Sequence, residues 1–376
     1  MHRFFSLITL VGATVFTPAY GRTQSAQAGR VLTSSAPPND HGRKEQVDLS
    51  AAAARKLNAK PGTSEASCPV LPPSALSKLC PERAQSPIAI RKPTGSQLPP
   101  NQTPFVIDAP GRRGVLDLRS AVDKQPLQIN GSYLAITTDP RGIYHNLVLD
   151  GFRVLGSKRE GVRVEGDVRN VTFRHFDIQH DASINYPPDL PTGFNVRSGS
   201  GILIEDGHIS GNRMTGLKYP NGDGLNIEKG VTNVTIRRVV SESHSDSAFD
   251  LLKGSNIRLE DVTGRNAARC VKTGAVHVVV THITCVGVQT AIELHGNDIT
   301  IDTLVYDPGG RTAKSWLFST NAGSAGQASL TVKRCMAPNG GPIRLPTADS
   351  IWLAKGKGVT VSLGPSCRRP ESGLTQ

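Results

Sequence analysis

Short runs rich in β-branched residues recur along the chain at a nearly constant spacing. Aligned on their first residues, they are NLVLDGF from Asn146, NVTFRHF from Asn170, NVTIRRV from Asn233, NIRLEDV from Asn256, HVVVTHI from His277 and DITIDTL from Asp298. The last four begin 23, 21 and 21 residues apart, and GILIEDGHI at 201–209 divides the wider gap before Asn233. This period predicts a solenoid, and without a leucine-rich-repeat frame the β-branched runs and turn asparagines favour an all-β, right-handed parallel β-helix.

The sequence before this pattern has a different composition. Residues 1–28 join a short basic start to an apolar run in MHRFFSLITLVGATVF and end in small residues, which predicts a secretory signal peptide. Residues 29–103 are rich in Ala, Ser, Pro, Gln and Gly without apolar periodicity, which predicts a low-complexity leader or linker. The β-helix is therefore expected over residues 104–376, in a protein that is secreted or periplasmic.

The cysteines and the charge fit an exported protein. Six cysteines without CxxC or Cys/His metal spacing indicate disulfides, and Cys68–Cys80 and Cys335–Cys367 are the candidate pairs. No window after the signal is apolar over the roughly 18 residues that a membrane span requires. The net charge of +12 is spread along the chain without Lys/Arg blocks, which argues against a nucleic-acid partner and fits an acidic polysaccharide outside the cytoplasm.

The period also predicts which side chains stack. Aligning GDGLNI (222–227), DSAFDL (246–251), ARCVKT (268–273) and TAIELH (290–295) gives one inward stack of Leu225, Phe249, Val271 and Ile292, and a second of Ile227, Leu251, Thr273 and Leu294. Between the two stacks, strand alternation turns one residue of each turn outward: Asn226, Asp250, Lys272 and Glu293. A second outward position carries Asp223, Ser247 and Arg269.

This register gathers charges on one face of neighbouring turns. Asp223, Asp246 and Asp250 converge, with Arg269 and Lys272 one turn further on. Outward residues of a coil are polar in any case, and surface ion pairs contribute little to stability. Three carboxylates beside two cations are nevertheless denser than solvation requires, so a site is predicted here.

The residues NGDGLNIEKG…HSDSAFDLLKG…ARCVKTGA, within 221–275, resemble family 9 polysaccharide lyases, which are pectate-lyase-like β-helix enzymes. In that family the DGF, DDGWDL and GFKLGG turns carry calcium-binding aspartates and a catalytic lysine. The resemblance implies that Asp223, Asp246 and Asp250 bind Ca²⁺ and that Lys272 is the base, with Arg269 beside it. Ser247 stands where the family has another aspartate, and the glycines that flank the family's lysine are missing.

The implied reaction is β-elimination on a uronate-containing glycan. The enzyme removes the C5 proton and expels the C4 oxygen, and Ca²⁺ on the uronate carboxylate stabilises the charge that develops. Lys272 must be partly neutral to act as the base; bound Ca²⁺ and Arg269 would lower its pKa, whereas Asp250 would raise it. The predicted substrate-binding residues are Arg213, Lys218 and Tyr219, in the loop before the first motif turn, and Glu293.

Two other functions fit the same residues. Asn221-Gly222-Asp223-Gly224 is similar to the NTDG element of family 28 glycoside hydrolases, the polygalacturonases, where Asp223, Asp246 and Asp250 could supply acid and base. The DD, GHG and RIK elements of that family are missing. A non-catalytic carbohydrate-binding β-helix, such as an adhesin, would use the same column as a binding face. Trp316, further along the chain, suits either a sugar-stacking role or a core or end-cap role.

Overall fold

The computed structural model describes residues 89–91, 105–108, 114–119, 125–130, 134–180, 191–213, 221–310, 314–320, 327–347 and 349–369. All of them belong to one structural unit, Arg83–Gln376. The predicted signal peptide and most of the predicted leader lie outside the described residues, as do Cys68, Cys80, Lys218 and Tyr219. The first described strand, β1, precedes residue 104.

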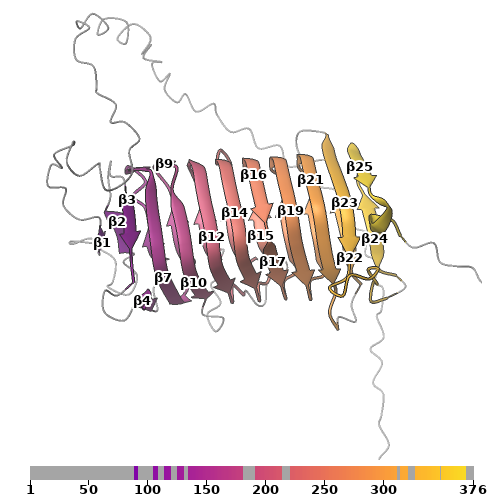
Figure 1. Cartoon of the computed structure of the whole chain (residues 1–376), viewed down its shortest axis with the longest axis horizontal. Helices are drawn as coiled ribbons and strands as arrows, with labels where there is room; N and C mark the ends of the chain where they lie inside the picture. The colour runs from indigo at the N-terminus through magenta and orange to yellow at the C-terminus, as the bar shows by residue number, and fades with distance from the viewer. Residues whose placement is uncertain are drawn as a thin grey trace, which may run out of the picture. The chain divides into compact units, whose positions relative to one another are not determined.

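Two long sheets wind around a common interior (Figure 1). The eleven-stranded sheet contains, in spatial order, β1 (Ala89–Arg91), β2 (Phe105–Asp108), β5 (Leu134–Thr137), β8 (Glu160–Val164), β11 (Thr192–Val196), β13 (Asp223–Ile227), β15 (Ser247–Leu251), β18 (Arg269–Thr273), β20 (Thr290–Leu294), β22 (Trp316–Thr320) and β24 (Ile351–Lys355). Only β1 and β2 pair antiparallel among the described strands, and every other pair is parallel.

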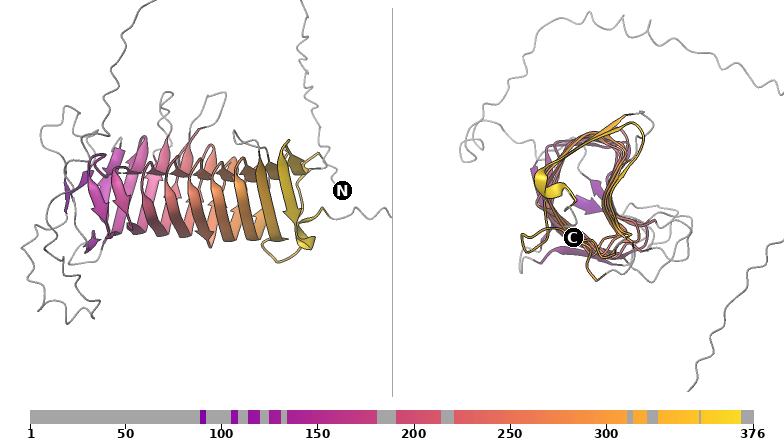
Figure 2. Two further views of the ribbon diagram at one scale, coloured as in Figure 1. Left: turned by 90° about the horizontal axis from the view of Figure 1, so that it is seen from above. Right: turned by 90° about the vertical axis from the view of Figure 1, so that its right-hand side faces the viewer.

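The fourteen-stranded sheet lies across the interior from the first. Its main path contains β25 (Val359–Leu363), β23 (Ala328–Met336), β21 (Asn297–Asp307), β19 (Val276–Val286), β16 (Ser255–Glu260), β14 (Thr232–Glu242), β12 (Ser200–Ser210), β10 (Thr172–His180), β7 (Leu147–Ser157) and β3 (Gly114–Asp117). The short strands β4 (Leu127–Asn130), β6 (Ile143–His145), β9 (Asp167–Arg169) and β17 (Val262–Arg265) join it at its margins. Seen end-on, successive turns superimpose (Figure 2), and the predicted right-handed parallel β-helix is confirmed.

The residue that opens each aligned run forms a corner of the coil. All six have a left-handed backbone, with φ between 53° and 56°: Asn146, Asn170, Asn233, Asn256, His277 and Asp298. Asn and Asp tolerate this region because their short polar side chains hydrogen-bond locally. Asn170 Nδ2 donates to Asn146 Oδ1 at 3.3 Å, and the same bond joins Asn256 to Asn233. The repeated asparagine is therefore a structural signal.

The interior is a continuous apolar stack. Strand pairing places Leu225 beside Phe249, Phe249 beside Val271 and Val271 beside Ile292, as the aligned turns predicted. All four are buried. Each large apolar side chain that leaves water completely contributes about 1.5–3 kcal/mol, so the stack is a main source of the coil's stability.

The described residues form two disulfides. Cys335 of β23 is bonded to Cys367 in the short 3₁₀ helix η1 (Pro365–Cys367), which confirms the predicted pair. Cys270 of β18 is bonded to Cys285 of β19, a pair that the sequence did not indicate. The second bond is buried and begins on the strand that carries Arg269 and Lys272, so it stabilises the turn on which the predicted site depends.

Removing the inner disulfide is expected to weaken the fold measurably. The double variant Cys270→Ala/Cys285→Ala frees a closed loop of 15 residues, for which chain entropy gives a loss of about 3 kcal/mol in the free energy of unfolding. Denaturant titration of oxidised wild type and variant measures the difference. An unchanged unfolding midpoint would show that this bond contributes nothing to the stability of the turn.

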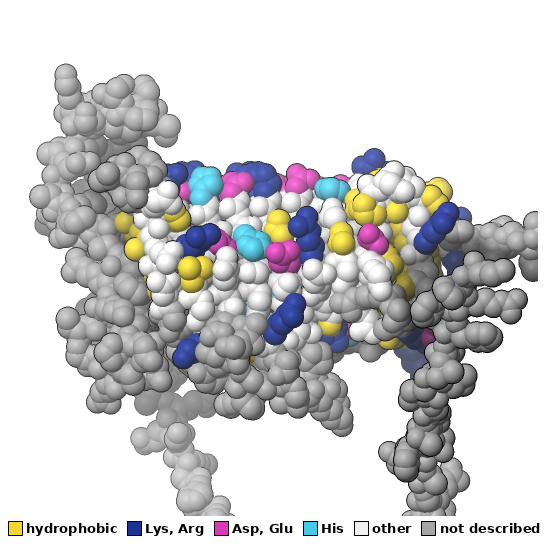
Figure 3. All heavy atoms as spheres, turned by 90° about the horizontal axis from the view of Figure 1, so that it is seen from below, with side chains coloured by type: hydrophobic (Ala, Val, Ile, Leu, Met, Phe, Trp, Pro, Cys, Tyr) yellow, Lys and Arg dark blue, Asp and Glu magenta, His cyan; other side chains and the backbone are white. Residues whose placement is uncertain are grey.

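The surface carries charges of both signs. On the face drawn in Figure 3, basic and acidic side chains alternate along the coil instead of forming one large patch. Ion pairs between neighbouring strands include Arg238 with Asp206 and Arg153 with Asp177. Within the described residues, no helix has both the length and the apolar character needed to cross a membrane.

Candidate functional site

The outward side chains of the eleven-stranded sheet form two rows that cross its strands. The first row contains Glu160, Thr192 and Asp223, and further along Ser247, Arg269, Thr290 and Trp316. The second row contains Arg163, Asn195, Asn226, Asp250, Lys272, Glu293 and Ser319. The predicted column from Asn226 to Glu293 is thus confirmed, and it extends in both directions.

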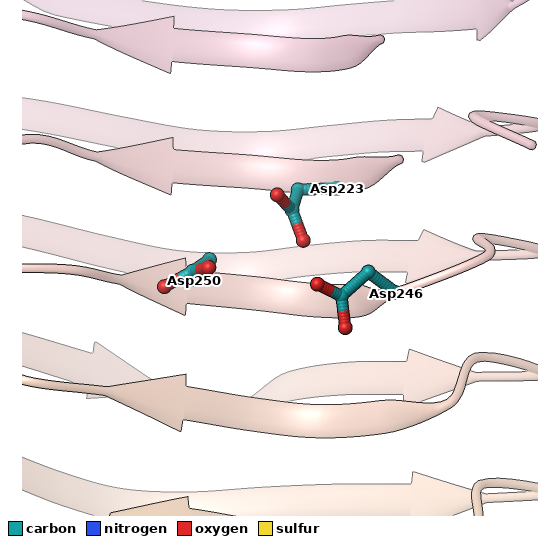
Figure 4. Close-up of side chains that lie close together, drawn as sticks. All are labelled: Asp223, Asp246 and Asp250. Atoms are coloured by element: carbon teal, nitrogen blue, oxygen red, sulfur yellow. The ribbon is translucent and has the colours of Figure 1, made fainter. Parts of the chain in front are cut away.

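Three aspartates converge where these rows pass β13 and β15. Carboxylate oxygens of Asp223, Asp246 and Asp250 all lie within 4.8 Å of one another (Figure 4). Asp223 opens β13, Asp250 lies within β15, and Asp246 directly precedes β15. The N–H of Ser247 donates to Asp223 Oδ1 at 3.0 Å, and the N–H of Asp246 donates to Gly222 O at 3.1 Å. These bonds join the two turns and hold the carboxylates together.

Two cations lie against the aspartates from the next turn. Lys272 Nζ is 2.9 Å from Asp250 Oδ2 and 3.8 Å from Asp246 Oδ2. Arg269 pairs with Asp246 on one side and with Glu293 on the other. The predicted catalytic and metal-ligating residues therefore form one connected group.

The pKa values reflect this crowding of charges. Asp223 keeps some exposure to the groove, yet the protein around it and the charges of Asp250 and Asp246 raise its pKa to about 8. Burial also raises the pKa of Asp250, although Lys272 opposes it. Burial favours a neutral Lys272, but the charge and hydrogen bond of Asp250 outweigh it and raise the pKa of the lysine. Of the effects expected from the sequence, that of Asp250, which raises this pKa, prevails among the protein's own residues.

The oxygen atoms around the cluster fit a cation. In the described part of the chain, Asp250 Oδ1, Asn226 Oδ1 and Ser247 Oγ are buried without a hydrogen-bond partner. A buried oxygen without a donor costs free energy, and hard cations such as Ca²⁺ bind oxygen ligands of this kind. Ser247 thus keeps an oxygen at the position where the resemblance calls for a carboxylate.

The cluster opens into a groove of about 350 Å³ along the sheet. Besides the cluster, its walls include Arg159, Glu160, Asn195, Arg197 and Glu228, none of which we predicted from the sequence. The turns EGVRV (160–164) and TGFNV (192–196) have the pattern of the motif turns, so extending the alignment upstream would have found Glu160 and Asn195.

The predicted substrate-binding residues have different surroundings. Glu293 is bound to Arg269 and to His295 Nε2, at 3.1 Å, and despite its partial burial these partners lower its pKa to about 2. Arg213 is exposed, donates to Ser243 O at 3.2 Å, and is not among the described residues that line the groove. Lys218 and Tyr219 stay predictions, since they lie outside the described residues.

A buried histidine supports the turn that precedes Asp246. His244 Nδ1 accepts from the N–H of Asn212 at 3.3 Å, and its Nε2 donates to Ser241 Oγ at 2.9 Å. The Ser241 hydroxyl in turn donates to Ala248 O at 2.8 Å. This network requires a neutral ring. Burial, with nearby His180, His208 and Arg213, lowers the pKa of His244 to about 3.

Acid is therefore expected to destabilise the protein through His244. A histidine with a depressed pKa contributes stability above its unfolded value of about 6.5, and this contribution falls by roughly 1.4 kcal/mol per pH unit as the pH drops toward 3. His244→Gln, which keeps a donor and an acceptor, should lose less stability than wild type between pH 6.5 and 4 in denaturant titrations. The exposed His277→Gln is the matched control, and equal slopes for all three proteins would contradict the assignment.

Comparisons with known proteins give little information on the function of this site. No protein-family model matches the chain, and no curated protein matches it. The Dettilon tailspike protein is similar in structure at 12% sequence identity and a TM-score of 0.40. The catalytic unit of a thermostable alpha-1,3-glucanase from Streptomyces thermodiastaticus is similar at 11% identity and a TM-score of 0.29. Each match covers 70% of this chain and 61% of the other, so the chain spans less than two thirds of either protein, and the function has to be inferred from the site itself.

Proposed function

We propose that the protein is a secreted or periplasmic polysaccharide lyase that cleaves a uronate-containing glycan by β-elimination. The observation that carries the proposal is the convergence of Asp223, Asp246 and Asp250 within 4.8 Å, directly beside Lys272 in an open groove. Carboxylates at this density suit a cation, and the lysine beside them is the one amine of the group, which can act as a base once it has lost its proton.

In the proposed mechanism, Lys272 Nζ removes the C5 proton of the uronate. The electrons of that C–H bond form the C4–C5 double bond. The C4–O bond breaks with its electron pair on the leaving oxygen, which takes a proton from water. Bound Ca²⁺ would neutralise the uronate carboxylate and acidify the C5 proton. Lys272 has to give up its own proton first, so the negative charge of Asp250 and Asp246 has to be compensated before the lysine acts.

Other residues of the cluster would position the substrate. Arg269 is held from both sides by Asp246 and Glu293, so its guanidinium lies at a defined place next to Lys272. Arg197, bound to Glu160 at 2.8 Å and to Glu228 at 3.5 Å, contributes positive charge further along the groove. A planar guanidinium suits the carboxylates of an acidic polysaccharide.

Hydrolysis is the second candidate, and the pKa of Asp223 is the observation that favours it. A carboxylic acid with a pKa of about 8 beside other carboxylates is the arrangement with which glycoside hydrolases separate acid from base. In that mechanism Asp223 would protonate the glycosidic oxygen, and Asp246 or Asp250 would act on the sugar or on water. Lys272 would then only balance charge.

One assay separates the candidates. The purified protein is incubated with Ca²⁺ and a panel of galacturonate, mannuronate, guluronate and glucuronate polymers. A lyase produces chain ends with ultraviolet absorbance from the new double bond, whereas a hydrolase produces reducing ends without that absorbance. Binding to a polymer without either product would leave only the carbohydrate-binding function, and the lyase proposal would fail.

A further inference from the structure

A second hollow lies on the same sheet, on the C-terminal side of the charged cluster. Its volume is about 340 Å³, and Gln289, Thr290, Glu293, Trp316 and Ser319 contribute to its walls. Arg269 pairs with Thr290, which pairs with Trp316, so the tryptophan lies in the row of Arg269, two strands further on. With strands about 4.8 Å apart, the separation along the sheet is roughly 10 Å.

The walls of this hollow have the composition of a sugar-binding site. Trp316 is only partly buried and offers a flat apolar surface, which can cover the C–H face of a pyranose ring. Gln289, Thr290 and Ser319 supply amide and hydroxyl groups for sugar hydroxyls. Lys314 Nζ lies over the indole ring, 6.0 Å from its centre, so a uronate on that side of the ring would bring its carboxylate to this charge.

Trp352, the other tryptophan of the chain, has the contacts expected of an end cap. Trp352 packs against the hydrophobic core, and its Nε1 donates to Cys367 O at 2.7 Å, which ties the C-terminal segment to the coil. Among the described residues, Trp316 does not belong to that core. Of the two roles that the sequence left open for Trp316, the hollow favours sugar stacking.

We infer that this hollow is a subsite for a sugar unit of the same glycan that meets Lys272. The two hollows lie on either side of the pair Arg269 and Lys272, so the glycan lies across the strands, from Glu160 on β8 to Trp316 on β22. Six strand spacings separate these ends, about 29 Å in all. The inference rests on the proposed function for the identity of the glycan. It also predicts that a glycan long enough to reach both hollows binds more tightly than a shorter one.

The kinetic test compares short and long substrates. Dimers and hexamers of galacturonate and of mannuronate are cleaved by wild type, Trp316→Ala, Trp316→Phe and the control Trp352→Phe. Trp316→Ala should raise KM for the hexamer about tenfold and abolish the preference for hexamer over dimer, and Trp316→Phe should restore much of that preference. An unchanged preference in Trp316→Ala, with the same melting temperature as wild type, would overturn the subsite.

A binding test separates this inference from the proposed chemistry. Because the chain has two tryptophans, Trp352→Phe leaves Trp316 as the only indole fluorophore. Its fluorescence is titrated with hexamers of galacturonate, mannuronate and, as a neutral glycan, cellohexaose. A response to a uronate hexamer supports the subsite even if no unsaturated ends form, in which case the lyase assignment fails. A response to cellohexaose alone supports a subsite for neutral glycans and overturns the uronate class, and no response to any hexamer overturns the subsite.

Discussion

Replacing Lys272 with alanine is expected to reduce lyase turnover by roughly a thousandfold, within the range that a positioned general base contributes. The side chain is the only described amine in the groove, and it contacts two of the three aspartates. Turnover is measured as the initial rate of double-bond absorbance on the uronate polymer that the panel identifies. The exposed Lys253→Ala, on the loop after β15, is the matched control and should keep full activity.

Lys272→Arg distinguishes a base from a fixed positive charge. Arginine keeps the charge beside Asp250 and therefore the fold, but it does not release its proton in proteins. Lys272→Arg should therefore lose as much turnover as Lys272→Ala. If Lys272→Arg retained activity, the residue would act only as a cation, and another group would have to remove the C5 proton.

The sequence predicted the coil because repetition turns a one-dimensional spacing into stacked neighbours. Leu225, Phe249, Val271 and Ile292 each need an inward position, and only one register satisfies all four. The same register brings Asp250 beside Lys272 without any further assumption. The part of the site that lies within the repeats was therefore accessible from the sequence.

What the sequence did not show depends on the path of the chain between the sheets. Cys270 and Cys285 lie on consecutive strands of different sheets, so their meeting requires knowing how the chain turns the corner between them. Arg269 was predicted as a catalytic neighbour, yet its pairing with both Asp246 and Glu293 depends on side-chain reach across turns. The protonation of Lys272 depends on net charge within a few ångströms, which residue spacing alone does not give.

Calcium is expected to stabilise the wild-type protein, and Asp223→Asn should remove that effect. An ion that binds only the folded state adds about 2.7 kcal/mol to the free energy of unfolding at a concentration of a hundred times its Kd. The amide keeps the acceptor for the Ser247 N–H but cannot become a third negative charge beside Asp246 and Asp250. Without Ca²⁺ the variant should therefore unfold at the same temperature as wild type or higher.

The measurement is thermal unfolding with Ca²⁺ and with a chelator, with Asp298→Asn as the matched control, because asparagine opens the equivalent corner of other turns. Asp223 must lose its proton before it can bind the ion, so with a pKa near 8 the stabilisation by Ca²⁺ should grow between pH 7 and pH 9. Equal stabilisation of wild type and Asp223→Asn would place the ion elsewhere. If turnover persisted in chelator, the cluster would work without a metal. Protonation of the aspartates alone would then have to lower the pKa of Lys272 enough for it to act as the base.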